Sequence, residues 1–438
     1  MKPTPQLRRH HLRWAAVGIV LIAIAGSVIG WIVFATEEDS EETPGGRSLP
    51  YGPPSPYPDV TDLAPDAINL ESDKTFPSLT YGIQTSLWWN PEYRKIGLDH
   101  INMMQFTHIR QKFAWADIEP VYLEEDDPAR YQWFYSDLVV NEVEGKGIKI
   151  VARLSTPPPW ALKPDVAYGD PPFDMGRLTD YCSALATRYR GRFAAYQLWN
   201  EPNLAREWAG LTPSPEGYVK LLAACATAIR EADPEAVIIS AGLSPTGSRD
   251  WTAIPDEEFL WRMYDAGAAA HFDILAVHAP GFKFAPERDP DESDPEGCLR
   301  WRCFRHVEHM RAIMVANGDA DKQIAVTEFG WTIDPRPESI YNWFAVTPEE
   351  QADYLVRAYQ YAAENWRPWV GLMIALNYPS PDWTEEDEEY WWAIGTVAPM
   401  PYGMDGRPAW PALVQMRKIS TNPDYSHPPR DQYLNPIE

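Results

Sequence analysis

The sequence of 438 residues has little cysteine and lacks the common loops for nucleotides and structural zinc. Only four Cys occur, no pair of CxxC motifs is present, and neither a GxGxxG nor a Walker pattern appears. A zinc ribbon and a phosphate-binding glycine loop are therefore not expected, and we predict no cofactor and no metal. The stretch CLRWRC places Cys298 and Cys303 five residues apart, which suits a small loop disulfide in an oxidising compartment. Cys182 and Cys225 lie in helical patterns, and we expect them to be buried thiols.

Basic residues are also scarce. The chain has 38 Lys and Arg against 63 Asp and Glu, which gives a formal net charge of −25. Residues 1–35 contain four basic residues and no acidic one, so the remainder is more acidic still. Such a body repels phosphates, and a nucleic acid partner is not expected. A strongly anionic polymer is likewise a poor substrate unless a local basic cleft overrides the net charge.

Long apolar runs are absent except for one near the N-terminus. Residues 14–35 read WAAVGIVLIAIAGSVIGWIVFA, 22 residues without a charge, after a basic tail at 1–13. This length suffices to cross a hydrocarbon core of roughly 30 Å as a helix. The preceding basic residues predict a single-pass anchor with a cytoplasmic N-terminus and an extracytoplasmic body. A cleaved signal peptide is the alternative, since Val33-Phe34-Ala35 resembles a cleavage site, although the run is long for one.

Residues 36–78 are rich in acids, Pro and Gly, and we interpret them as a linker that holds the body away from the membrane. From residue 79 onward, short apolar runs alternate with helical patterns, and we assign residues 79–425 to one domain, with a C-terminal tail at 426–438. The apolar runs are 79–87, 107–115, 147–155, 194–201, 236–244, 272–279, 323–331 and 369–378. The helical patterns are 91–104, 134–144, 175–190, 215–232, 256–270, 303–317, 348–365 and 408–418.

Eight strand–helix units in strict alternation predict a single (β/α)8 barrel. A doubly wound sheet is the alternative fold, but it offers no reason for a count of eight. Chemistry in such barrels sits at the C-terminal ends of the strands, so polar and aromatic residues there become candidates. These are Arg110, Trp115, Asn200, Glu201, His278, Glu328 and Trp331.

Two of these candidates are carboxylates on opposite sides of the predicted barrel mouth. Glu201 follows the fourth apolar run and Glu328 the seventh. Such a pair is the minimum apparatus for glycoside hydrolysis, provided that one acid is protonated and the other ionised. Trp199 and Pro202 flank Glu201, and we expect apolar surroundings to raise the pKa of its carboxyl group. We expect Arg110 to lie near Glu328 and to keep it ionised.

The motifs around both carboxylates resemble those of retaining glycoside hydrolases of the (β/α)8 clan A. WNEPN at 199–203 matches the clan's Asn-Glu pair after strand four, and TEFGW at 327–331 matches its second Glu on strand seven. The resemblance covers roughly residues 79–420 and leaves family 39 and family 5 both open. It implies Glu201 as general acid/base and Glu328 as nucleophile, with Asn200 binding the 2-hydroxyl of the sugar and Arg110 beside the nucleophile. It also implies retention of configuration.

Two positions depart from the clan pattern. The clan usually carries a Tyr on strand six that hydrogen-bonds the nucleophile, and this chain has His278 there. His278 either fills a related polar role or is an ordinary strand-end His. The clan also tends to place a Trp at the end of strand eight, where this chain has ALNYPSPDW, so Asn377, Tyr378 or Trp383 must serve. These departures leave the identity of the sugar open.

Aromatic residues near strand ends are expected to stack on sugar rings, and Trp160, Trp331 and Trp115 are the substrate-binding candidates. The acidic segment 382–392 is interpreted as a solvated loop, with cation binding as the alternative. Together these features predict an exported, membrane-tethered retaining glycosidase that acts on a β-linked poly- or oligosaccharide. A non-catalytic glycan-binding barrel on the cell surface and a transglycosylase with the same residues are the alternatives.

Overall fold

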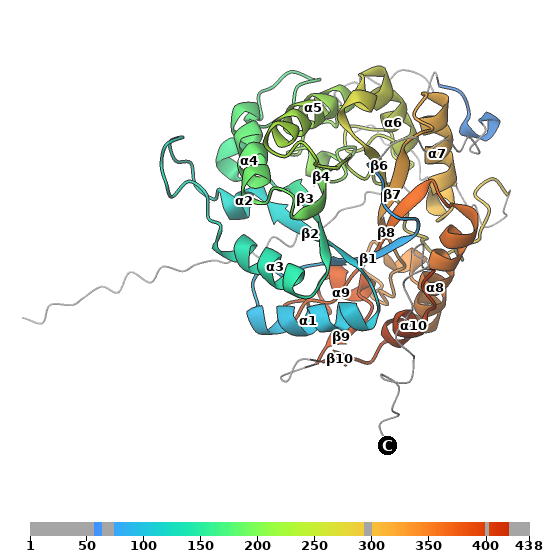
Figure 1. Cartoon of the computed structure of the whole chain (residues 1–438). Helices are drawn as coiled ribbons and strands as arrows, with labels where there is room; N and C mark the ends of the chain where they lie inside the picture. Colours follow the sequence, from blue (N-terminus) through green and yellow to red (C-terminus); the bar gives the residue numbers. More distant parts are fainter. Residues whose placement is uncertain (1–56, 64–73, 293–299, 399–402, 420–438) are drawn as a thin grey trace, which may run out of the picture. The chain divides into compact units, whose positions relative to one another are not determined.

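The computed structural model describes residues 57–63, 74–292, 300–398 and 403–419. Within these residues, eight parallel strands form a closed barrel in which each strand pairs with its neighbours in sequence and β8 pairs with β1. The predicted (β/α)8 barrel is thus confirmed (Figure 1). The strands are β1 (Thr80–Thr85), β2 (His108–Ala114), β3 (Lys149–Ser155), β4 (Phe193–Leu198), β5 (Ile238–Ile239), β6 (Ile274–His278), β7 (Gln323–Phe329) and β8 (Val370–Ala375).

Helices follow the strands and surround the barrel, as the alternating sequence pattern predicts (Figure 1). Several begin where a capping side chain meets a proline: Asn90 before Pro91, Ser214 before Pro215, and Thr347 before Pro348, which also forms a capping box with Glu350. The helices are α1 (Pro91–Met103), α2 (Trp115–Ile118), α3 (Phe134–Gly145), α4 (Met175–Arg188), α5 (Pro215–Ala232), α6 (Asp256–Asp265), α7 (His306–Ala316), α8 (Pro348–Asn365), α9 (Glu388–Trp392) and α10 (Ala409–Gln415).

Alternate residues of each strand face either the barrel interior or the helices. On β3, Val151 belongs to a small interior cluster, whereas Ile150 and Ala152 belong to the large cluster that packs against the helices. The interior cluster contains mostly branched or small side chains: Phe76, Val151, Ala195, Ile239, Ile274, Ala276, Ala325, Leu372 and Ile374. These side chains fill the barrel as a core, so the polar network described below has a firm apolar floor.

Three features differ from the sequence predictions. The fifth strand is much shorter than its apolar run, and part of the acidic segment 382–392 forms α9. Part of the predicted linker lies against the barrel, because Tyr57 stacks on Trp261 of α6 with ring centroids 5.3 Å apart and Val60 is buried. No helix among the described residues is long and apolar enough to span a membrane. The predicted anchor at 14–35 lies outside the described residues.

The expectation that Cys182 and Cys225 are free thiols is wrong. The two residues form a disulfide that joins α4 to α5, with Cα atoms 5.6 Å apart and a sequence separation of 43 residues. Their helical patterns were recognised correctly, but only the packing of α4 against α5 brings the two sulfur atoms together. Cys303 is also disulfide-bonded, while its predicted partner Cys298 lies outside the described residues.

Replacement of both Cys182 and Cys225 by Ala should lower the free energy of unfolding by about 4 kcal/mol, because the unfolded chain loses a cross-link that closes a 43-residue loop. Chemical denaturation of the oxidised wild type and the variant would measure the difference. Cys303→Ala, which removes the other disulfide and leaves the α4–α5 cross-link intact, gives the contribution of that second bond for comparison. Equal stability of the double variant and the wild type would contradict a stabilising role of this disulfide.

Candidate active site

Glu201 reaches the barrel mouth through an unusual backbone turn directly after β4. Trp199 and Glu201 both have positive φ angles, 79° and 41°, a region that costs of order 1–3 kcal/mol for residues other than glycine. The Glu201 N–H donates to the carbonyl of Gly242 at 3.0 Å, which holds the turn against the end of β5. Strain of this kind gathers at functional sites, and here it redirects the carboxylate into the mouth.

Glu328 lies on β7, and the structure brings its carboxylate close to that of Glu201. One oxygen of each carboxylate and one ring nitrogen of His278 all lie within 4.8 Å of one another. His278 Nδ1 lies 3.0 Å from Glu201 Oε1 and 3.7 Å from Glu328 Oε2. His278, at the end of β6, therefore sits between the two acids, where its N–H donates to an ionised Glu201.

Gly242 makes room for this histidine. A Cβ atom on Gly242 would lie 2.2 Å from His278 Cδ2 and 2.8 Å from Thr327 Oγ1, which is too close for either contact. The absence of a side chain after β5 thus leaves space for the imidazole of His278 beside Gly242. The other ring nitrogen, Nε2, is buried and has no hydrogen-bond partner among the described residues.

Arg110 organises the polar layer beneath the two carboxylates. Its guanidinium donates to Gln197 Oε1 at 2.6 Å and to Asn200 Oδ1 at 2.8 Å, and it also contacts Gln84 and pairs with Glu328. Arg110 is buried inside β2 rather than at its end, so its long side chain carries the charge up to the mouth. As the sequence predicted, Arg110 lies beside Glu328.

Asn200 is held by two cations. Besides Arg110, Arg153 of β3 donates to Asn200 Oδ1 at 3.1 Å and lies 3.5 Å from Glu328 Oε1. The Asn200 amide nitrogen donates to Glu207 at 3.4 Å. The side-chain oxygen of Asn200 is therefore already hydrogen-bonded to two arginines, and its NH₂ group is the part that can contact a ligand.

Sequence reasoning missed several members of this network: Gln84, Arg153, Gln197, Arg206, Glu207 and Glu388. A signal existed for the first three, because each is a polar residue within an otherwise apolar strand. No sequence signal pointed to the others, which lie on connections and on α9 and meet the strand ends only in the folded chain.

The expectation that apolar neighbours raise the pKa of Glu201 is wrong. Burial does act in that direction, but the ion pair with Arg206 and the hydrogen bond from His278 outweigh it and lower the pKa of Glu201 to about 2. Arg206 Nη2 lies 2.6 Å from Glu201 Oε2. The ring of Trp199 turns away, packs on Phe173 at 4.6 Å and does not determine this pKa.

The other acids of the mouth fall into two groups. Burial would raise the pKa of Glu328, but His278 and Arg110 lower it, so Glu328 is ionised at neutral pH. Burial raises the pKa of Glu388 on α9 to about 8, so this carboxyl group is largely protonated at pH 7. Burial likewise raises the pKa of Glu207. The mouth therefore contains ionised carboxylates and, at Glu388, a carboxyl group that retains a proton.

Glu201, His278 and Glu328 are close enough together to bind a metal ion. The positive charges around them, however, disfavour metal binding. Arg110 and Arg153 form ion pairs with Glu328, and Arg206 forms an ion pair with Glu201. Three guanidinium groups already neutralise the two carboxylates, so an added cation would be repelled.

Two of the three tryptophans expected to stack on sugars have packing roles instead. Trp331 is fully buried, fills the space beside Gly281 and donates its indole N–H to the carbonyl of Phe284 at 2.9 Å. Trp115 is buried and donates to Glu119 at 2.7 Å. Neither exposes a ring face, which corrects the prediction of stacking for both. Trp160 is half-buried against Trp115 and stays a candidate.

The end of β8 lacks the tryptophan that the clan usually has there, and Asn377, Tyr378 and Trp383 are the candidates to replace it. The structure gives these three residues different surroundings. Tyr378 is buried, and its hydroxyl lies 2.7 Å from His100 Nδ1 of α1, behind the barrel wall. Asn377 is buried, with an Oδ1 atom that has no hydrogen-bond partner within the part of the chain that the structure describes. Trp383 is half-buried and lines a cavity of about 200 Å³ with Tyr390. Of the three, only Trp383 has an accessible ring.

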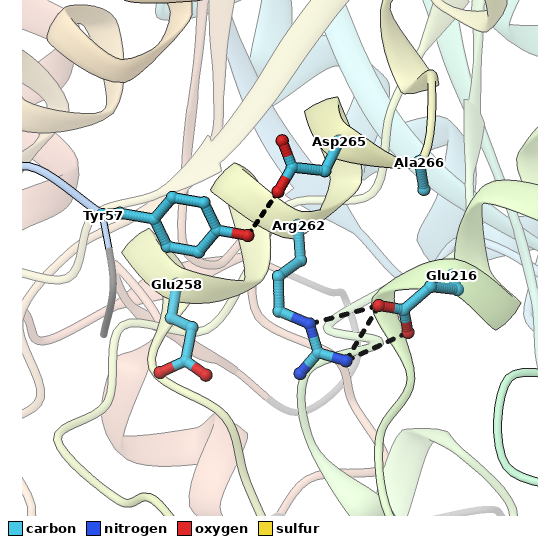
Figure 2. A pocket seen from close by; sticks show the side chains of 6 residues that line it. All are labelled: Tyr57, Glu216, Glu258, Arg262, Asp265 and Ala266. Carbon is cyan, nitrogen blue, oxygen red and sulfur yellow. Dashed lines mark hydrogen bonds and ion pairs between the residues drawn. The ribbon is translucent and has the colours of Figure 1, made fainter. Parts of the chain in front are cut away.

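A separate hollow of about 370 Å³ lies on the outside of α5 and α6, as Figure 2 shows. Four of its polar groups pair with each other, Arg262 with Glu216 at 2.8 Å and Tyr57 with Asp265 at 2.5 Å, while Glu258 pairs with Arg249. These contacts attach the segment around Tyr57 to the barrel. The hollow is thus explained by packing of the chain on itself.

The chain matches the family Cellulase (glycosyl hydrolase family 5) over residues 71–278. It is also 26% identical over 179 residues to Endoglucanase CelA of Streptomyces lividans, a match that covers 40% of this chain and 32% of that enzyme. Together these findings support a clan A glycoside hydrolase. The family match includes Glu201 and ends at His278, so it does not cover Glu328. Glu328 is brought beside Glu201 by the closed barrel, in which it lies on β7.

Solved structures agree on the fold. A family 39 glycoside hydrolase from Bacteroides cellulosilyticus WH2 superposes with a TM-score of 0.54 at 18% identity, over 79% of this chain and 64% of that chain. A glucosidase from Croceicoccus marinus gives 0.55 at 16% identity, over 80% and 68%. The chain spans about a third of the Streptomyces enzyme and about two thirds of the family 39 structure. The predicted resemblance to the clan is confirmed by the family 5 match, and the family 39 structure agrees with it in fold.

Replacement of Arg206 by Met should raise the pKa of Glu201, because the nearest cation is lost. In the wild type this carboxylate contributes stability that is present above the unfolded pKa of about 4.5 and is lost as the pH falls toward 2. The stability difference between wild type and variant should therefore grow by about 2 kcal/mol from pH 3 to pH 7. Denaturant unfolding across this range measures it.

The matched control is Arg206→Met in a Glu201→Gln chain, where the part of the pH dependence that comes from Glu201 should disappear and only the coupling of Arg206 to Glu207 and Glu388 should remain. A pH dependence of undiminished size in this background would assign the effect to those other partners of Arg206.

Proposed function

We propose that the chain is a retaining glycosidase that hydrolyses β-linked poly- or oligosaccharides through Glu201 and Glu328. The observation that carries this proposal is the approach of their carboxylate oxygens to within 4.8 Å. Retaining enzymes place the two carboxyl groups about 5–5.5 Å apart, whereas inverting enzymes need about 6.5–9.5 Å to admit a water molecule. A non-catalytic barrel would not need two acids held this close against their mutual repulsion.

In this proposal Glu328 is the nucleophile. Arg110 and Arg153 hold its carboxylate ionised and fix its orientation, so that an oxygen can attack the anomeric carbon and form a glycosyl-enzyme. The NH₂ group of Asn200, whose carbonyl is held by the same arginines, binds the 2-hydroxyl of that sugar. His278 takes the place of the tyrosine that the clan usually has beside the nucleophile.

Glu201 is the general acid/base, and its lowered pKa in the free protein sets a condition on the reaction. It must gain a proton before it can protonate the leaving oxygen, so a bound sugar has to displace Arg206 and exclude water. Loss of that ion pair leaves burial as the main influence, which raises the pKa of Glu201. After the glycosyl-enzyme forms, the ionised Glu201 activates a water molecule for the second step.

Replacement of Glu328 by Gln should abolish turnover, since no nucleophile remains. Glu201→Gln should lower kcat by about 10²–10⁴-fold on natural glycans but much less on an aryl glycoside with a good leaving group, which needs no acid. With azide present, Glu201→Gln should release a β-glycosyl azide. A panel of β-glycans and aryl glycosides, with NMR of the first-formed anomer, tests both variants and identifies the substrate.

Glu349→Gln, on the exposed first turn of α8, is the control and should retain full activity. Unchanged turnover in Glu328→Gln would rule out the assignment, and an inverted product would rule out the double displacement. Sugar transfer to an added alcohol in preference to water would favour the transglycosylase.

The proposal also includes export and tethering by residues 14–35, supported by the uncharged run and the basic residues before it. In a bacterial host the full chain should sediment with membranes and resist extraction by high salt and alkali. External protease should cleave the barrel from intact spheroplasts, and deletion of residues 1–35 should leave the protein inside the cell. A soluble extracytoplasmic protein that begins near residue 36 would instead establish the signal peptide.

A further inference from the structure

Two histidines and a glutamate converge between α6 and α7, apart from the carboxylates of the barrel mouth. His306 and His309 lie one turn apart at the start of α7, so their rings lie on the same helix face. Both are buried, with 1% and 5% of their surface exposed. Glu257, in the first turn of α6, completes the group, and its Oε1 atom lies 3.8 Å from His306 Nδ1 and 3.9 Å from His309 Nδ1.

The outer nitrogens of both rings are held by carboxylates. His306 Nε2 lies 2.8 Å from Asp256 Oδ2, and His309 Nε2 lies 3.2 Å from Asp291 Oδ2. In the tautomer that donates Nε2–H to a carboxylate, the lone pair of each ring is on Nδ1. Carboxylates that orient histidines in this way are the usual outer partners of histidine metal ligands.

The inner nitrogens face each other. His306 Nδ1 and His309 Nδ1 are only 3.3 Å apart, so two lone pairs there would repel unless a proton or a cation lies between them. Arg300 donates to Glu257 Oε2 at 3.0 Å and leaves the Oε1 atom directed at the two rings. Three potential ligand atoms thus converge from two helices. The other polar atom of each side chain already has a partner: Asp256, Asp291 or Arg300.

We propose that this cluster is a zinc site, with His306 Nδ1, His309 Nδ1 and Glu257 Oε1 as ligands and water in the fourth position. Tetrahedral zinc with Zn–N distances of about 2.0–2.1 Å places two nitrogens about 3.3–3.4 Å apart, which is the separation found here. Glu257 Oε1 would need to approach by about 0.5 Å. Two imidazoles and one carboxylate favour zinc over calcium or magnesium, which prefer oxygen ligands.

Zinc at this position would be a structural clamp. It would tie α6 to α7 and, through Asp291, to the connection between β6 and α7. Phe282 and Trp301 of that connection pack at 5.3 Å, and the indole of Trp301 covers Gly247 after β5. The connection begins directly after His278, so the clamp would secure one wall of the barrel mouth. This inference does not depend on the proposed glycosidase activity.

The test uses the full chain after removal of metals with a chelator. Titration with Zn²⁺ in competition with a chromophoric chelator should show one tight site per chain, and zinc should raise the melting temperature. Co²⁺ should give the visible absorption bands of tetrahedral coordination. A folded wild-type chain that binds no zinc would overturn the proposal.

Variants locate the ion. His309→Gln and Glu257→Gln should each weaken zinc binding at least tenfold, and Asp291→Asn should weaken it by about 10–100-fold through loss of the outer partner. Asp291 has 46% of its side chain exposed, so this variant tests the site even where a buried substitution fails to fold. Circular dichroism of the metal-free variants checks folding.

Two controls complete the test. His271→Gln, outside the cluster, should bind zinc like the wild type, and so should a chain with His10→Gln and His11→Gln, which removes the adjacent histidines near the N-terminus. Zinc binding that is unchanged in the three cluster variants, or lost in either control, would overturn the assignment.

Discussion

The candidate active site depends on the buried guanidinium of Arg110. Its fixed fork of donors reaches Gln84 on β1, Gln197 on β4, Asn200 after β4, and Glu328 on β7. A charge inside a barrel is tolerated only when its donors are satisfied and a counter-ion is close, and removal of one partner of such a pair typically costs about 3–5 kcal/mol. Burial lowers the pKa of Arg110 to about 10, which still leaves it charged at neutral pH. One side chain therefore sets the orientation of four others.

Charge balance at the mouth follows from this arrangement. Two carboxylates within 4.8 Å repel each other in a medium of low dielectric constant, and the arginines and His278 compensate for that repulsion. The compensation is unequal. Glu328 is held by Arg110 and Arg153 on the barrel strands, whereas Glu201 is held by His278 at the end of β6 and by Arg206 on the connection after β4. The acid proposed to exchange a proton thus has its arginine counter-ion outside the barrel strands.

The fold was largely predictable because its signals are local. Apolar runs and cap-proline pairs such as Thr347-Pro348 located all eight strands and eight helices, and WNEPN and TEFGW marked both acids in advance. The failures concern contacts between distant residues. Trp115 and Trp331 follow strands, as a sugar platform would, but their rings turn into the core. Trp199 is close to Glu201 in sequence, but the residue that forms an ion pair with the Glu201 carboxylate is Arg206.

The sequence by itself determined the barrel, its order of strands and the positions of Glu201 and Glu328, because strand period, helix caps and strand ends are properties of short segments. Tertiary structure decided the rest: the Cys182–Cys225 disulfide, the Arg110 network, the lowered pKa of Glu201, and the convergence of His306 and His309 with Glu257. These features depend on the distance between side chains from different elements. Such distances are fixed only when the ring of strands closes and the helices pack around it.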